Sequence, residues 1–182
     1  MKFVKEFNNL KFNYEVGKKT WFGTGGVTKV FLLIDKIKTL QILIKFTPKA
    51  VPLLVLGAGS NILIRDGGFK GLTIKLGKDF RQIDFKKKDM ILELGSGVKD
   101  SEISKFCLQN SISGFEFLKG IPGTIGGNIY MNAGCYGNNI SELFLSCKIL
   151  TRQGKIKELE KKQIEFGYRN SSIDKNAIIL SA

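Results

Sequence analysis

Histidine is absent from all 182 residues of the sequence. This absence excludes histidine as a general acid or base, the Ser–His and Cys–His nucleophilic pairs, and histidine-bound metals. Cysteine is scarce, because Cys107, Cys135 and Cys147 are the only three, and they form no C-x-x-C pair. We therefore predict no disulfide framework and no metal site, and we expect all three thiols as small buried apolar groups.

Long apolar runs are also lacking. No run approaches the roughly 18 residues that a transmembrane helix needs, and residues 1–6 lack the apolar stretch of a secretory signal. The composition, 43% hydrophobic and 25% charged, is ordinary for a folded protein and excludes disorder. We therefore expect a soluble cytoplasmic protein of one domain, or of two small lobes that share a core, without a membrane partner.

Acidic residues are few, and the net charge is +13, from 29 basic and 16 acidic residues. Such an excess is typical of proteins that bind nucleic acids. However, only four of the basic residues are arginine, the side chain on which base reading depends most. We favour a lysine-rich solvated surface whose field attracts anionic, phosphate-bearing ligands, with no nucleic-acid partner. A basic protein that binds nucleic acids or anionic surfaces stays as the alternative.

The apolar pattern of the first 78 residues predicts a small α/β lobe. A strand is expected at 30–34, and Asp35 then caps a helix with Ile37, Leu40 and Ile44 on one face. Further strands are expected at 53–56, 62–64 and 72–76.

From residue 79 the pattern changes. Asp100 is expected to cap a second helix, with Ile103, Phe106 and Cys107 turned inward. The glycine-rich stretch 113–137 is expected to be irregular, and irregular chain of that length inside a domain is usually functional. Strands are expected at 80–85, 90–94, 144–151, 156–159 and 177–180, the third and fourth as a hairpin.

The first chemical motif is the segment 53–61, LLVLGAGSN, in which a buried strand runs into a Gly-x-Gly turn. A dinucleotide-binding Rossmann site needs a third small residue and a long helix, but Ile62 takes that position and Asp66 begins another turn. We therefore predict a loop between two strands whose N–H groups cradle phosphate, with Ser60 and Asn61 as additional donors. An ordinary glycine turn is the alternative for this motif taken alone.

The second motif is GIPGTIGGN at 120–128, followed by MNAGCYG at 131–137. Its glycines are denser than a structural loop requires, so free N–H groups and the Thr124 hydroxyl are candidate donors to a diphosphate or to the polar edge of a ring system. Two such loops in one basic chain favour a cofactor that contains a diphosphate.

The third motif is FGYRNSS at 166–172. The guanidinium of Arg169 is suited to bind a carboxylate or phosphate through two parallel hydrogen bonds, and Tyr168 places a phenol beside it. A surface arginine beside a core tyrosine is the structural alternative.

Together these motifs resemble the UDP-N-acetylenolpyruvoylglucosamine reductase family, flavoenzymes that make UDP-N-acetylmuramate for bacterial peptidoglycan. The resemblance follows the family order over nearly the whole chain, and its most specific part is the pair IPGTIGG and MNAG. The matching stretches are 20–22, 24–26, 56–61, 66–69, 120–127, 131–134 and 167–169.

The resemblance implies an α+β, two-lobed FAD-binding domain of the vanillyl-alcohol-oxidase (PCMH) type. We expect an N-terminal segment at 1–20 and this domain at 21–182, with a first lobe at 21–78 and a second lobe at 79–182. The resemblance also implies non-covalent FAD, NADPH as the hydride donor and UDP-N-acetylglucosamine enolpyruvate as the small-molecule substrate. A related FAD-dependent sugar oxidase is the alternative within this fold.

The same resemblance implies the residues of the site. Arg169 is expected to be catalytic, because it polarises the substrate carboxylate, and Tyr168 is expected to bind substrate beside it. The expected FAD-binding residues are Leu56, Gly57, Ala58, Gly59, Ser60, Asn61, Ile121, Pro122, Gly123, Thr124, Gly126, Gly127 and Ala133.

Members of this family continue into a substrate-binding domain that carries a serine proton donor and a late glutamate. The sequence stops at Ala182, and Ser171 and Ser172 do not match the family serine because they directly follow the Tyr-Arg pair. We therefore expect the substrate-binding domain to be missing, and the FAD-binding part alone to show little or no turnover. A truncated gene product, half of a split gene whose other half is a separate partner chain, and an excised domain all stay open.

Overall fold

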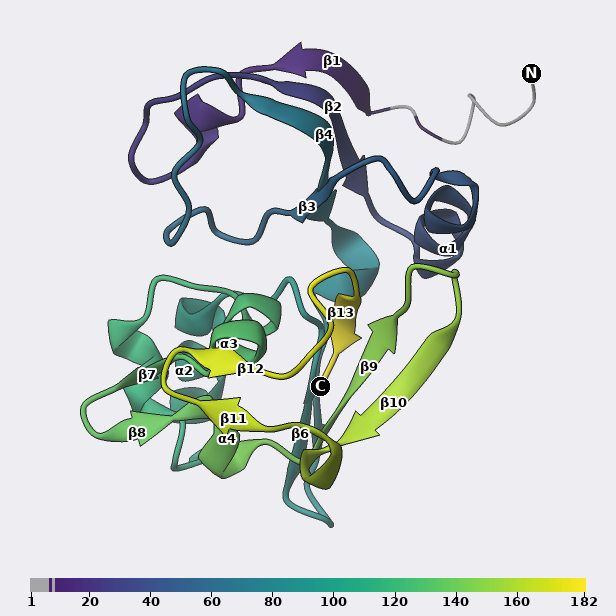
Figure 1. Cartoon of the computed structure of the whole chain (residues 1–182). Coiled ribbons are helices and arrows are strands. Elements are labelled where there is room, and N and C mark those ends of the chain that lie inside the picture. The colour runs from purple at the N-terminus through teal and green to yellow at the C-terminus, as the bar shows by residue number, and fades with distance from the viewer. Residues whose placement is uncertain (1–6, 8) are drawn as a thin grey trace.

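The computed structural model describes residue 7 and residues 9–182, so residues 1–6, which carry the expectation about a secretory signal, lie outside the described residues. Figure 1 shows two lobes, one above the other in this view. The first lobe contains β1 (Leu10–Tyr14), β2 (Thr28–Ile34), α1 (Ile37–Phe46), β3 (Leu53–Val55) and β4 (Phe69–Leu76), with a short 3-10 turn at Gly17–Lys19.

The first lobe is built on a sheet with the strand order β1-β2-β4-β3. Strand β2 pairs antiparallel with β1 and parallel with β4, and β3 also runs parallel to β4. The two central strands are largely buried, and on them the hydroxyl of Thr73 donates to that of Thr28 at 2.8 Å. Strand β1 pairs Leu10 with Leu32, so part of the segment assigned to residues 1–20 belongs to this sheet.

The second lobe is mixed. Its strands are β5 (Ile83–Lys86), β6 (Ile91–Leu94), β7 (Gly134–Cys135), β8 (Asn138–Asn139), β9 (Ser146–Leu150), β10 (Ile156–Glu160), β11 (Phe166–Gly167), β12 (Asn170–Ser171) and β13 (Ile178–Ser181). Its helices are α2 (Asp100–Gln109), α3 (Ile125–Met131) and α4 (Ile140–Leu143), with 3-10 turns at Lys78–Phe80, Glu116–Gly120 and Lys161–Gln163. The main sheet has the order β10-β9-β13, and β5-β6, β7-β8 and β11-β12 form separate pairs.

The lobes share a hydrophobic core. Leu32 and Ile74 of the first sheet pack in one cluster with Leu150 of β9 and with Ile178 and Leu180 of β13. A second cluster lies within the second lobe, around α2, α3 and α4. The boundary at 78/79 stays a prediction, and the first lobe buries its apolar face with residues from the second.

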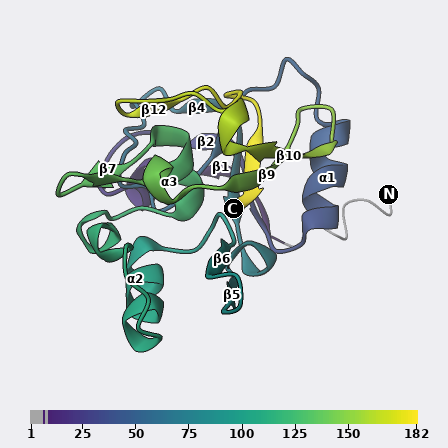
Figure 2. The same cartoon turned by 90° about the horizontal axis from the view of Figure 1, so that it is seen from below.

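The tip of the β9–β10 hairpin also joins the lobes. The Nη2 of Arg152 donates to the carbonyls of Pro48 and Val51, at 2.8 Å each. Gln41 of α1 reaches the Gly154 carbonyl at 3.5 Å. Figures 1 and 2 both show the hairpin beside α1. The connection that leads into β3 is therefore held by the second lobe.

The strand predicted at 62–64 is wrong. This segment is extended coil, because its backbone neighbours belong to the loop at Gly25 and Gly26 and not to a sheet. The Gly26 N–H donates to the Arg65 carbonyl at 3.0 Å, and a Cβ on Gly25 would overlap the Ile64 carbonyl. The phosphate loop predicted between two strands therefore follows one strand only.

Both predicted helix caps are also wrong. Helix α1 begins after Lys36, and Asp35 instead accepts a hydrogen bond from the Lys78 N–H at 3.0 Å. Helix α2 begins after Lys99, whose N–H is capped by Glu102 at 3.1 Å. Asp100 is the first helical residue and is buried. Its carboxylate does not cap the helix and instead accepts hydrogen bonds from Gly123 and Asn128.

The glycine-rich stretch 113–137 is more regular than predicted, because it holds the Glu116–Gly120 turn, α3 and β7. Ile125 and Ile129 are both buried, which stabilises α3 although Gly126 and Gly127 lower its helix propensity. The strand predicted at 80–85 begins only at Ile83, after the Lys78–Phe80 turn.

Cys107 and Cys147 are buried as expected, whereas Cys135 is only partly buried. Burial raises the pKa of the Cys147 thiol to about 11. Within the described part of the chain, no group of cysteine and acidic side chains is arranged to hold a metal ion. None of the helices in that same part is long and apolar enough to cross a bilayer.

Candidate functional site

A cleft of about 900 Å³ lies between the two lobes. Its wall in the first lobe comes from the end of β3, the glycine turn that follows it and the end of β4. Its wall in the second lobe comes from the loop after β6, the glycine loop before α3 and the approach to β13. The lining residues are Trp21, 53–58, Lys75, Leu76, Arg81, Ser96, Gly97, Lys99, Ser101, 119–124, Gly126, Gly127, Tyr130 and 175–179.

The two predicted glycine loops meet in this cleft. A Cβ on Gly57 would lie 2.6 Å from the Thr124 Oγ1, and a Cβ on Gly126 would lie 2.9 Å from the Ser96 Cβ. Glycine at these positions therefore allows neighbouring segments to approach each other closely.

The loops differ in their hydrogen bonding. Within the described residues, the N–H groups of residues 57–61 donate to no other protein group. In the second loop the N–H groups of Ile121, Ile125 and Gly126 donate to carbonyls at 2.9–3.0 Å, and that of Gly123 donates to Asp100. The prediction of free amide donors is therefore wrong for these residues of the second loop.

Asp100 lies behind the second loop. It is 1% exposed, and its carboxylate accepts from the Gly123 N–H at 2.8 Å and from the Asn128 side chain at 2.6 Å. Burial raises the pKa of Asp100 to about 6, against the opposing effect of these two hydrogen bonds. A buried carboxylate thus holds the loop to the start of α2.

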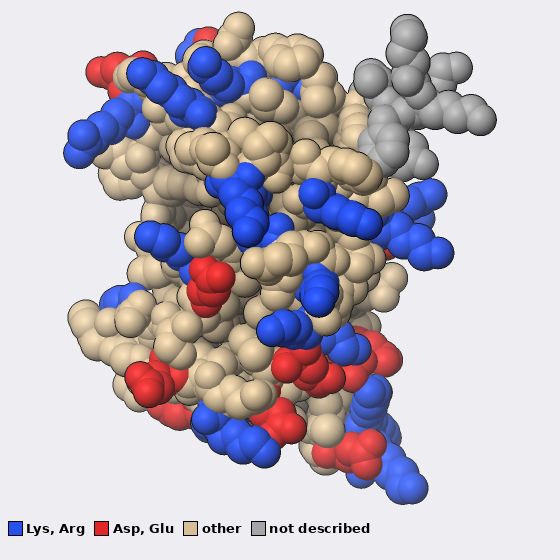
Figure 3. All heavy atoms as spheres, turned by 45° about the vertical axis from the view of Figure 1, so that its right-hand side comes forward, with Lys and Arg blue, Asp and Glu red and all other residues tan. Residues whose placement is uncertain are grey.

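The charge of the cleft has one sign. Its lining holds Lys75, Arg81, Lys99, Lys119 and Lys175, and no acidic side chain among the described residues. Burial lowers the pKa of Lys75, and the positive charges of Lys99 and Arg81 lower it further. Figure 3 shows basic side chains over much of the face it draws, including the level where the lobes meet, where an acidic group lies among them. Cations that converge in this way are suited to an anionic ligand.

Sequence reasoning missed Lys75, Arg81 and Lys99. One signal was present, because Lys75 is the only charged residue in the strand segment 72–76. Arg81 and Lys99 lie in connections without any pattern and are brought together only by the fold. Arg81 also pairs with Glu102 of α2, which leaves Lys75 and Lys99 without an acidic partner among the described residues.

Nine of the predicted cofactor residues line the cleft: Leu56, Gly57, Ala58, Ile121, Pro122, Gly123, Thr124, Gly126 and Gly127. Gly59, Ser60, Asn61 and Ala133 do not line it. Gly59 has a φ of +76°, and its carbonyl accepts the N–H of Trp21 at 2.9 Å. Ala133 is bonded within the second lobe, to Asn128 and Ile140. A ligand role for any of these residues stays a prediction.

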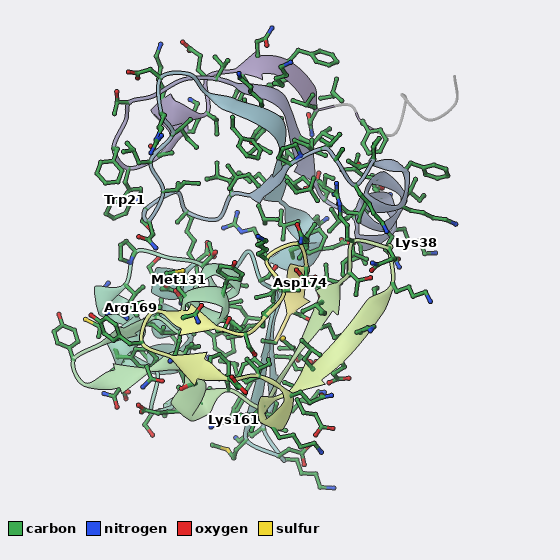
Figure 4. All side chains as sticks on the ribbon, in the orientation of Figure 1. Trp21, Lys38, Met131, Lys161, Arg169 and Asp174 are labelled. Carbon is green, nitrogen blue, oxygen red and sulfur yellow. The ribbon has the colours of Figure 1, made fainter. Side chains whose placement is uncertain are left out.

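Tyr168 and Arg169 also lie outside the cleft lining, at the tip of the β11–β12 hairpin. Tyr168 is 92% exposed, which excludes the alternative of a core tyrosine. The guanidinium carbon of Arg169 lies 5.3 Å from the centre of the Tyr168 ring, and its Nη2 donates to the Gly134 carbonyl at 2.9 Å. Figure 4 shows Trp21 and Arg169 on different lobes, at the same end of the molecule as drawn. Their role in binding substrate stays a prediction.

The residues present fit a dinucleotide such as FAD. The cleft volume is suited to an extended cofactor, and the N–H groups of residues 57–61 and the basic lining suit a diphosphate. Ser96 adds a further candidate donor. It lines the cleft, and its buried Oγ has no hydrogen-bond partner within the described residues. A buried hydroxyl without a partner carries a free-energy cost that a ligand can remove.

Known proteins support this interpretation. Residues 28–160 match the family model described as FAD binding domain. The chain is 41% identical over 172 residues to UDP-N-acetylenolpyruvoylglucosamine reductase of Rickettsia canadensis, covering 94% of this chain and 58% of that protein. It is 38% identical over 184 residues to the reductase of Pelagibacter ubique, covering 98% of this chain and 61% of that protein.

Among solved structures, the fold is similar to the UDP-N-acetylenolpyruvylglucosamine reductase of Thermus caldophilus. The TM-score is 0.80 at 24% identity, covering 95% of this chain and 59% of that chain. The chain thus spans about three fifths of the length of these relatives. The family resemblance and the α+β FAD-binding fold predicted from the sequence are confirmed, and the chain belongs to the FAD binding domain family.

Proposed function

We propose that this chain binds FAD non-covalently in the cleft between its lobes, as the cofactor-binding part of a reductase. The proposed reaction is reduction of the enolpyruvyl group of UDP-N-acetylglucosamine enolpyruvate by NADPH, to give UDP-N-acetylmuramate for peptidoglycan in the cytoplasm. The names of the relatives support this substrate class. The observation that carries FAD binding is the row of unbonded N–H groups at 57–61, of which those of Gly57 and Ala58 line the basic cleft.

The proposed binding role of each residue follows from its chemistry. The N–H groups of Gly57 and Ala58, which line the cleft, donate to the diphosphate, and Lys75 and Lys99 balance its charge. The second loop contributes its shape and the Thr124 hydroxyl, since several of its amides are occupied within the protein. When bound, FAD supplies hydride transfer, and the protein supplies orientation and charge.

Arg169 is proposed to hold the substrate carboxylate, with Tyr168 beside it. A guanidinium stabilises the negative charge that develops as hydride adds to the enolpyruvyl group. Because the chain covers about three fifths of its relatives, the proton donor is proposed to lie in the part that the chain does not match, whether that part is joined to it or supplied by a separate partner chain.

FAD binding can be measured directly. Trp21 is the single tryptophan and lines the cleft, so its fluorescence reports on a bound flavin. Titration with FAD should quench Trp21 saturably and leave a yellow protein after gel filtration. ADP should compete, whereas riboflavin, which lacks the diphosphate, should bind much more weakly. A protein that stays colourless with unquenched Trp21 would contradict the proposal.

Turnover measurements test the proposal that this chain is the cofactor-binding part of a reductase. The chain with FAD, NADPH and the enolpyruvyl sugar nucleotide should oxidise little NADPH. The part of a relative that this chain does not match, added as a separate chain, should increase the rate. Oxidation of a free sugar by the FAD-loaded chain would instead support a sugar oxidase. Strongly salt-dependent binding of a mixed oligonucleotide, without FAD binding, would support the nucleic-acid alternative.

A further inference from the structure

Three side-chain hydrogen bonds join the end of α3 and the turn after it to the β11–β12 hairpin. Asn132 Nδ2 donates to the Gly167 carbonyl at 3.0 Å, and Arg169 Nη2 donates to the Gly134 carbonyl at 2.9 Å. The Ser171 hydroxyl donates to the Tyr130 carbonyl at 2.8 Å. The hairpin that presents Arg169 is therefore attached to a helix that lines the cleft.

The hairpin needs this attachment. Strands β11 and β12 have two residues each, and a pair that short is marginal without outside contacts. Arg169 has a φ of +54°, a left-handed conformation that is unfavourable for arginine. Such a conformation persists only where surrounding contacts impose it, and it is enriched at functional sites.

Asn132 is suited to hold the hairpin in the conformation that Arg169 adopts. It ends α3 with φ +42° and ψ +54°, where helices usually place glycine and where asparagine is tolerated. Unlike glycine, it uses both ends of its amide. Its Nδ2 binds Gly167 in the hairpin, and its Oδ1 accepts the Ser141 N–H of α4 at 3.2 Å. The side chain thus connects three elements at one point.

We propose that Asn132 is a positioning residue that orients the β11–β12 hairpin, and with it the guanidinium of Arg169, through its hydrogen bond to the Gly167 carbonyl. The inference rests on the proposed function, because the carboxylate-binding role of Arg169 is proposed there. It assigns Asn132 a purpose beyond ending the helix.

Three substitutions separate the two roles of Asn132, which are to end α3 and to orient the hairpin. Asn132→Gly keeps the left-handed backbone but loses both hydrogen bonds. Asn132→Asp keeps the acceptor for Ser141 but loses the donor to Gly167. Asn132→Ala loses both bonds and adds backbone strain. Asn110→Asp is the matched control, because Asn110 ends α2 and its Nδ2 donates to the Phe106 carbonyl at 2.8 Å, far along the chain from the hairpin.

The first readout is native-state cleavage after Arg169 by an arginine-specific protease. In the glycine and aspartate variants this cleavage should accelerate about tenfold, the effect of losing one hydrogen bond of ordinary strength. Cleavage at Arg81 and Arg152 should stay near that of the parent and of Asn110→Asp, while the Tm should fall by only a few degrees, as the loss of one or two hydrogen bonds implies. Equal acceleration at all three arginines would show a merely structural role and overturn the proposal.

The second readout is spectroscopic. The Nε–H signal of Arg169 should shift in the Asn132→Asp variant near neutral pH. It should return toward the parent position as the new carboxyl is protonated near its ordinary pKa of about 3.9, since the neutral acid again donates to Gly167. A signal that does not move in this variant at any pH would overturn the proposal. Neither readout needs FAD, so failure of the parent to bind FAD would count against the proposed function alone.

Discussion

Asp100 and Gly123 are hydrogen-bonded in both directions. The Gly123 N–H donates to the Asp100 Oδ2 at 2.8 Å, and the Asp100 N–H donates to the Gly123 carbonyl at 3.3 Å. The amide that glycine leaves accessible is therefore used by the protein, and the carboxylate shapes the loop that faces the cleft. A Cβ on Gly123 would lie 2.7 Å from the Asp100 Oδ2, which explains why this position needs glycine.

The first prediction concerns pH. The pKa of Asp100 is raised from 3.8 to about 6 in the folded protein. Between these values the folded state binds a proton that the unfolded chain has released, so the contribution of Asp100 to stability falls as pH rises through this window and changes no further above it. Two pKa units correspond to about 3 kcal/mol. Urea unfolding of Asp100→Asn should lack this fall, and Asp66→Asn, at an exposed residue, should retain it.

The second prediction concerns the contact between the loops. Gly57→Ala should weaken FAD binding at least tenfold and lower the Tm, because the new Cβ would lie 2.6 Å from the Thr124 Oγ1. Gly67→Ala is the control, since a Cβ there meets nothing within 4 Å. Adding Thr124→Ala to Gly57→Ala should recover the Tm but not the full affinity. Unchanged FAD affinity in Gly57→Ala, measured by Trp21 quenching, would contradict the placement of the cofactor.

The third prediction concerns the basic lining. Lys75→Gln should weaken FAD binding about tenfold, the effect of one lost charge interaction in a partly buried site. The same substitution should slightly raise the Tm of the free protein, because Lys99 and Arg81 then lose a repelling neighbour. Lys87→Gln, in the exposed turn after β5, should change neither quantity. Tighter FAD binding in Lys75→Gln would show that this cluster does not face the cofactor.

The fourth prediction concerns the attachment between lobes. Arg152→Ala removes both hydrogen bonds from the guanidinium to the carbonyls of Pro48 and Val51. We expect a loss of about 2 kcal/mol in the free energy of unfolding, the typical value for bonds to a charged donor. The exposed Arg65→Ala is the control. Equal urea midpoints for the two variants would show that the hairpin tip contributes nothing to stability.

Part of the fold follows from local patterns. The strands near 30–34, 53–56 and 72–76 and the hairpin after residue 144 were predicted within a few residues, because buried strands are short apolar runs. The absence of a helix after Gly59 correctly excluded a Rossmann site. Helix α3 was missed because its glycines oppose helix formation, and only the tertiary burial of Ile125 and Ile129 stabilises it.

The candidate site was predicted less completely. The glycine motifs pointed to the cleft, but no local pattern shows that Asp100 occupies the Gly123 amide, or that Lys75 and Lys99 converge from separate elements. These relationships depend on pairing between residues that are distant in sequence. Contacts of this kind leave no local sequence pattern, so only the folded structure shows them.

The shared core has a consequence for synthesis. The apolar core of the sheet that ends with β4 at Leu76 also contains Ile178 and Leu180, which leave the ribosome roughly a hundred residues later. At ordinary elongation rates this delay is about 5 to 20 s. For that interval α1 is present but the second-lobe part of this core is not, and a chaperone that recognises apolar surfaces has a defined period in which to protect the incomplete core.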